Sequence, residues 1–63
     1  MTLGEKISYY RKACGLTQEE LADRLSVSRQ TIYKWEAGLA KPTLDKLEGL
    51  TKILEIDFNI LLG

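Results

Sequence analysis

Histidine is absent from this sequence, and Cys14 is its only cysteine. Those two residue types supply most metal sites and many nucleophilic catalytic sites, and a lone cysteine also excludes an internal disulfide. No glycine-rich phosphate loop is present either. The acidic residues Glu19, Glu20 and Asp23 form a small carboxylate group, but their position suits the first turns of a helix, where they face solvent. We therefore expect a protein that is not an enzyme, with no metal, no cofactor and no small-molecule substrate.

Long apolar stretches are also missing. A transmembrane helix needs about 20 consecutive apolar residues, and no segment approaches that length. The first residues do not have the basic, then apolar, pattern of a secretory signal. The sequence thus predicts a soluble, cytoplasmic protein with no membrane partner.

The chain has no excess of charge of either sign, because nine basic residues balance nine acidic ones. This balance is not typical of a nucleic-acid-binding domain. The charges are unevenly distributed, however: residues 24–41 carry a net charge of +3, residues 42–63 carry −2 and residues 1–23 carry −1. The excess of basic charge is therefore concentrated in residues 24–41.

Apolar residues recur at helical spacing throughout, and no alternating pattern predicts a strand. Five N-cap residues precede the apolar stretches, and two of them, Thr2 and Thr17, have a glutamate three residues later, which is the pattern of a capping box. The predicted helices run from Leu3 to about Cys14, from Thr17 to the turn at Ser26, from Ser28 to about Gly38, from Thr43 to about Glu55 and from Asp57 to Leu62. The fold class is therefore all-α, a five-helix bundle forming a single domain over residues 1–63.

The same periodicity predicts which side chains face the core. In the fourth helix we expect Leu44, Leu47, Leu50, Thr51 and Leu54 to point inward. In the fifth helix we expect Leu61 and Leu62 to do so. Cys14 is expected to be a small, half-buried hydrophobic residue, as free cysteines usually are.

The stretch from Thr17 to Glu36 predicts two short helices joined by a tight turn. Leu21, Ala22 and Leu25 form the apolar side of the first helix, and Ile32 and Trp35 that of the second. The outward face of the second helix carries Arg29, Gln30, Thr31, Tyr33 and Lys34. Arg can bind guanine and Gln adenine through two hydrogen bonds, so such a face suits the major groove of DNA. The alternative is an ordinary solvated helix face.

Residues 17–36 resemble the helix-turn-helix of the phage-repressor family, of Cro/cI type and Xre-like. The matching residues are Thr17-Gln18-Glu19-Glu20-Leu21-Ala22, Val27-Ser28-Arg29-Gln30-Thr31-Ile32, Trp35-Glu36 and Gly38. This resemblance implies a lambda-repressor-like DNA-binding domain of a transcriptional regulator, with a recognition helix at about 28–37. Ser26 and Glu55 stand where the family often has glycine, and a left-handed Ser26 would cost about 1 kcal/mol.

The resemblance also implies roles for individual residues. Base contacts are expected from Arg29, Gln30 and Lys34, with Thr31 and Tyr33 nearby. Phosphate contacts are expected from Gln18, Ser28, Lys41 and backbone N–H groups, although Gln18 and Lys41 are alternatively plain solvated side chains. Arg11 and Glu36 are expected to form an ion pair across the core; the alternative is two separate surface charges.

The C-terminal end offers a possible dimer contact. Ile60 is a large apolar residue at an outward position where the family usually has a polar one, and Phe58 and Leu39 are expected beside it. We therefore expect a homodimer on a palindromic operator in double-stranded DNA. The alternative is that Ile60 is a singly exposed isoleucine, which is common on protein surfaces and needs no explanation. Two alternative functions remain at this stage: a protein-interaction module on the same fold, and the antitoxin of a toxin–antitoxin pair.

Overall fold

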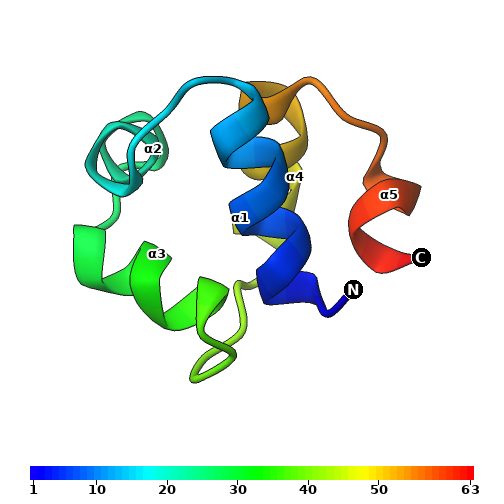
Figure 1. Ribbon diagram of the computed structural model, residues 1–63, viewed down its shortest axis with the longest axis horizontal. Coiled ribbons are helices and arrows are strands. Elements are labelled where there is room, and N and C mark those ends of the chain that lie inside the picture. The colour runs from blue at the N-terminus through cyan, green and yellow to red at the C-terminus, as the bar shows by residue number, and fades with distance from the viewer.

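The computed structural model describes all 63 residues, which form five helices and no strand (Figure 1). The helices are α1 (Leu3–Ala13), α2 (Gln18–Leu25), α3 (Arg29–Glu36), α4 (Leu44–Leu54) and α5 (Phe58–Leu62). Helices α2 and α3 lie on one side of α1, and α5 lies on its other side (Figure 1). The predicted all-α, five-helix architecture is confirmed.

Every predicted N-cap is used. Thr2 and Thr17 each form a complete capping box, with Glu5 and Glu20 as the reciprocal partners. In the second box the Glu20 N–H donates to Thr17 Oγ1 at 3.0 Å, and the Thr17 N–H donates to Glu20 Oε1 at 2.8 Å. That backbone donor lowers the pKa of the Glu20 carboxyl below its usual value, and the Thr2 N–H does the same for Glu5. Ser28, Thr43 and Asp57 cap the other three helices.

Two helices end in a left-handed residue that is not glycine. Ser26 closes α2 with φ of 58°, and Glu55 closes α4 with φ of 55°. After each of them a backbone N–H reaches back to the last helical turn: Val27 donates to Ala22 O at 3.0 Å, and Ile56 donates to Thr51 O at 3.1 Å. Each bond adds a second donor to a carbonyl that also accepts the N–H of the C-cap residue, and it offsets part of the strain of about 1 kcal/mol at each position.

The core is built from all five helices. Ile7, Leu21, Ile32 and Leu50 are fully buried at its centre, and Trp35 is 5% exposed, as its place in the apolar stripe predicts. The other core residues are Leu16, Ala22, Leu25, Leu47, Leu54 and Leu61.

Three predictions of burial are wrong. Leu44 is 63% exposed because it opens α4 away from the stripe that Leu47, Leu50 and Leu54 form. Leu62 is 59% exposed because α5 turns Phe58 and Leu61, three residues apart, toward the core, and the neighbouring position then faces outward. Cys14 is exposed because it caps α1 beyond its last turn, where its thiol donates to Leu54 O at 3.6 Å.

Glycine lets helices approach closely at two places. A Cβ atom on Gly4 of α1 would collide with the carbonyl oxygen of Trp35 and would lie 2.6 Å from that of Glu36, so α1 rests directly on the backbone at the end of α3. A Cβ on Gly49 of α4 would lie 2.7 Å from a methyl group of Leu25. The α1–α3 approach fixes the position of the last turn of α3.

Candidate nucleic-acid interface

Helix α3 presents one polar face to solvent and buries the other. Ile32 and Trp35 anchor it in the core, while Arg29, Gln30, Tyr33 and Lys34 are exposed. The Ser28 hydroxyl accepts the Thr31 N–H at 3.1 Å and lies 2.9 Å from Thr31 Oγ1. Ser28 and Thr31 thus use their hydroxyl groups mainly on each other, and Thr31 is half-buried.

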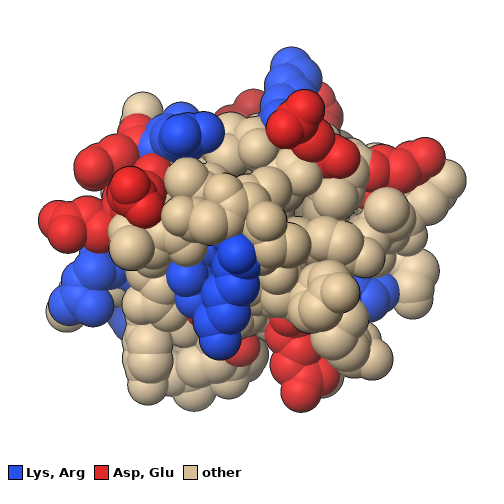
Figure 2. Space-filling view, turned by 45° about the horizontal axis from the view of Figure 1, so that its top comes forward, with Lys and Arg blue, Asp and Glu red and all other residues tan.

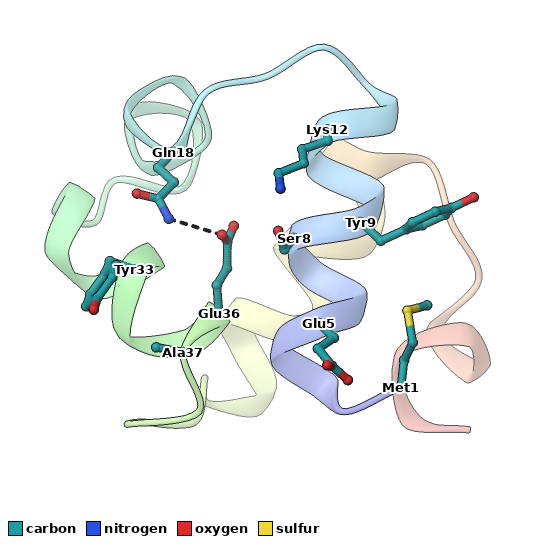
Figure 3. Close-up of a pocket in the computed structure, with 9 residues that line it drawn as sticks. All are labelled: Met1, Glu5, Ser8, Tyr9, Lys12, Gln18, Tyr33, Glu36 and Ala37. Carbon is teal, nitrogen blue, oxygen red and sulfur yellow. Dashed lines mark hydrogen bonds between the residues drawn. The ribbon is translucent and has the colours of Figure 1, made fainter.

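A hydrogen-bonded cluster ties α3 to the two preceding helices. Arg11 donates from Nε to Glu36 Oε2 at 2.6 Å and from Nη2 to Glu36 Oε1 at 3.1 Å. Its third nitrogen donates to the Leu16 carbonyl at 2.8 Å. Gln18 Nε2 donates to Glu36 Oε1 at 3.0 Å (Figure 3). The end of α3 is therefore held by α1 and by the start of α2.

The ion pair in this cluster is almost dry. The side chains of Arg11 and Glu36 are 10% and 9% exposed. A buried pair of charges is tolerated only when its remaining donors and acceptors are satisfied, and no buried side-chain nitrogen or oxygen lacks a partner here. The structure brings Arg11 and Glu36 together across the core rather than leaving them as separate surface charges.

Gln18 is placed differently from a free first-turn residue. One of its amide hydrogens is engaged by Glu36, so the second hydrogen and the Oε1 atom remain for an outside partner. Lys41 is exposed in the loop between α3 and α4, and its side chain has no ion-pair partner.

Two open hollows meet at Gln18. The first, here called the α1–α3 groove, has a volume of about 520 Å³ and is lined by α1, by Gln18 and by Tyr33, Glu36 and Ala37 of α3 and its C-cap (Figure 3). The second, here called the α2 hollow, has a volume of about 510 Å³ and is lined only by polar residues: Arg11, Thr17, Gln18, Glu19 and Arg29. Both hollows border the edge of the exposed face of α3.

The predicted dimer contact is only partly assembled. Ile60 is 37% exposed and Leu39 is 70% exposed, whereas Phe58 is half-buried and packs against the core. The loop that carries Leu39 and the helix that carries Ile60 lie at different edges of the molecule (Figure 1). Leu39 therefore lies apart from Ile60, and the other exposed apolar residue of α5 is Leu62. The dimer contact through Ile60, Phe58 and Leu39 stays a prediction.

Charge is mixed over the molecular surface. Basic and acidic side chains alternate over the face shown in Figure 2, and no single broad basic patch forms there. No cluster of three or more metal-ligating side chains occurs. None of the five helices has the length and apolar character needed to cross a membrane.

Some residues that shape this region were not found from the sequence. Gly4 is one of them, although a glycine inside a helix costs about 1 kcal/mol relative to alanine and so signals a close approach. The bond from Gln18 to Glu36 carries no sequence signal, because it depends on how α2 and α3 are angled. Lys12, which lies on the α1–α3 groove, has nothing in its sequence context that distinguishes it from an ordinary helix-end lysine.

Comparison with known proteins identifies the class of this fold and site. The family model described as "Helix-turn-helix" matches residues 7–61. The chain belongs to this helix-turn-helix family, of the Xre and Cro/cI type, and the resemblance seen in the sequence is confirmed.

Individual relatives agree with this assignment. The chain is 39% identical over 63 residues to the HTH-type transcriptional activator BcrR of Enterococcus faecalis, covering 100% of this chain and 31% of that protein. It is 40% identical over 55 residues to the HTH-type transcriptional regulator DicA of Escherichia coli, covering 87% of this chain and 41% of that protein. The crystal structure of SinR, a master regulator for biofilm formation, in complex with DNA superposes with a TM-score of 0.91 at 28% identity, covering 98% of this chain and 100% of that one. The chain thus spans less than half the length of these two curated relatives.

Proposed function

We propose that this protein is a sequence-specific DNA-binding domain of a transcriptional regulator, with α3 as the recognition helix in the major groove. The observation that carries the proposal is the exposed face of Arg29, Gln30, Tyr33 and Lys34 on a helix whose other side is locked in the core. Base-reading side chains need such rigid support, because they must reach base edges in one defined register. The DNA complex of SinR and the regulatory names of the relatives support the same function.

The proposal divides the contacts by role. Arg29, Gln30 and Lys34 read base edges, with Thr31 and Tyr33 beside them, while Gln18, Ser28 and Lys41 hold phosphates. Ser28 contributes at the start of α3, where backbone N–H groups favour anions. A domain with this role acts where the DNA is, which the sequence predicts to be the cytoplasm.

Selection of bound sequences from a random DNA pool is the direct test. We expect the pool to converge on one sequence, with an affinity that falls steeply as salt rises, because bound phosphates release counterions. The proposal would be refuted if no sequence were enriched after several rounds and if binding of DNA did not depend on the salt concentration.

Replacing Arg29 with alanine is expected to weaken binding to the selected sequence by about 1–3 kcal/mol and to relax the preference at one base pair. Arginine at the start of a recognition helix reaches guanine with two bonds, and alanine makes neither of them. The measurement is a titration of selected and random DNA. Arg24→Ala, which removes an exposed arginine at the end of α2, is the control and should leave base preference unchanged. An equal loss on both DNAs would reassign Arg29 to the phosphate backbone.

We further propose that two copies bind a palindromic site through α5. One such domain makes few base contacts, and symmetry doubles them on half-sites about 34–36 Å apart. Ile60 and Leu62 are the exposed apolar residues of α5, and this small patch predicts a weak dimer that forms fully on DNA.

Ile60→Glu is therefore expected to abolish cooperative binding to the palindrome while leaving binding to a single half-site intact. Sedimentation at high concentration, with and without DNA, measures the association. Leu39→Glu, at the other edge of the molecule, is the control and should sediment as the wild type does without DNA. If wild type and Ile60→Glu are both monomeric and bind DNA with equal cooperativity, α5 is not the interface.

A second candidate function follows from the zero net charge, which suits a protein-interaction module on the same fold better than a DNA binder. The antitoxin of a toxin–antitoxin pair would combine the two roles. Salt-dependent retention on nonspecific DNA separates the first alternative from the proposed function, because only phosphate binding gives a steep salt dependence.

A further inference from the structure

Lys12 is an unpaired cation at one end of the α1–α3 groove. It is exposed in the last turn of α1, and the only ion pair of the protein is the one between Arg11 and Glu36. Lys12 and Gln18 lie at the same end of the groove, and the Lys12 ammonium group and the Ser8 hydroxyl are directed into it (Figure 3). Two donors and a positive charge therefore converge beside Gln18.

The two ends of the groove differ in charge. Glu5 and Met1 lie at the end opposite Lys12 (Figure 3). Between the ends lies Glu36, whose charge is balanced by Arg11 at 2.6 Å. The end nearest α2 thus combines Arg11, Lys12 and Glu36 into a net charge of +1, whereas at the far end the Glu5 carboxylate is balanced by the N-terminal ammonium group of Met1. An anion is therefore favoured near Lys12.

This end of the groove is also continuous with the proposed DNA-binding face. Gln18 lines both the α1–α3 groove and the α2 hollow, and Arg29 lines that hollow. Tyr33 belongs to the exposed face of α3 and forms one wall of the groove. A DNA strand that passes Gln18 while α3 occupies the major groove would therefore run along the edge of α1 that carries Lys12.

We infer that Lys12 is a phosphate contact, and that the DNA interface extends from the helix-turn-helix onto α1. The ligand is a phosphodiester of the strand that Gln18 holds, bound by the Lys12 ammonium group and the Ser8 hydroxyl. This inference rests on the proposed DNA-binding function. The contact carries no base information, because every phosphate offers the same oxygens.

Lys12→Gln tests the inference because it removes the charge and keeps most of the side-chain length. One phosphate contact fewer lowers the slope of log affinity against log salt by about 1, and at about 0.1 M salt the affinity should fall roughly five- to tenfold. The loss should be the same on selected and on random DNA. Thermal unfolding verifies that the variant is folded.

Lys52→Gln is the matched control. Lys52 is also an exposed lysine in the last turn of an eleven-residue helix, α4, so its removal costs the same interaction with the helix dipole. The Lys52→Gln substitution should leave both the affinity for DNA and the slope of log affinity against log salt unchanged. A Lys12→Gln variant that behaves like Lys52→Gln, while the wild type binds DNA, would overturn the inference and leave the proposed function standing. Wild-type protein that shows no salt-dependent DNA binding would overturn both.

Discussion

Alanine in place of Arg11 is expected to destabilise the protein by about 3–5 kcal/mol, because the substitution strands the Glu36 carboxylate in a nearly dry site. It also leaves the Leu16 carbonyl without its donor. A chain of 63 residues has a free energy of unfolding of roughly 3–9 kcal/mol, at the usual 0.05–0.15 kcal/mol per residue. The variant should therefore lie near the limit of folding, as chemical denaturation would measure.

Combining Arg11→Ala with Glu36→Ala identifies the cause. Removing both charges leaves neither stranded, so the double variant should lose clearly less than the sum of the two single losses. Lys12→Ala, one residue along the same helix and exposed, should change stability by no more than about 0.5 kcal/mol. Small, additive losses for the two single variants would show that the two charges do not stabilise each other.

Gly4→Ala is the second substitution with a large expected effect, a loss of about 3 kcal/mol. The added methyl group would meet the carbonyl oxygens of Trp35 and Glu36, and backbone atoms held in a helix cannot move aside as a side chain can. Alanine is the better helix former by about 1 kcal/mol, so propensity alone predicts a gain. Denaturation midpoints of the variant and the wild type decide between the two effects.

Gly49→Ala provides the comparison, since it adds the same methyl group within another helix. There the new atom meets only the end of the Leu25 side chain, which can change its rotamer, and the gain in helix propensity offsets the crowding. We expect a change within about 1 kcal/mol. If the two glycine variants lose equal stability, backbone contact at Gly4 is not the cause.

The sequence was sufficient to predict the five helices and the residues at which they begin, because capping and helical periodicity are local. Thr17 and Glu20 lie three residues apart, and their reciprocal bonds need no other part of the chain. The burial of Trp35 likewise follows from spacing alone.

What the sequence could not supply depends on helix ends and on helix angles. Leu62 has the same chemistry as Leu61, and only the orientation of a one-turn helix decides which of them is buried. The short distance from Gln18 to Glu36 requires knowledge of how the N-terminus of α2 approaches the C-terminus of α3. For the same reason, the position of Lys12 beside Gln18 became visible only in three dimensions.

The docking of α1 against the end of α3 has a consequence for transplanting the motif. In an isolated peptide of residues 17–36, Glu36 could still accept the hydrogen bond from Gln18 but would have no Arg11 to pair with. The carbonyl groups of Trp35 and Glu36 would no longer be packed against Gly4. Helices of eight residues are also too short to persist alone in water. Residues 17–36 are therefore not a portable peptide: a graft that is to keep their fold must bring α1 with it.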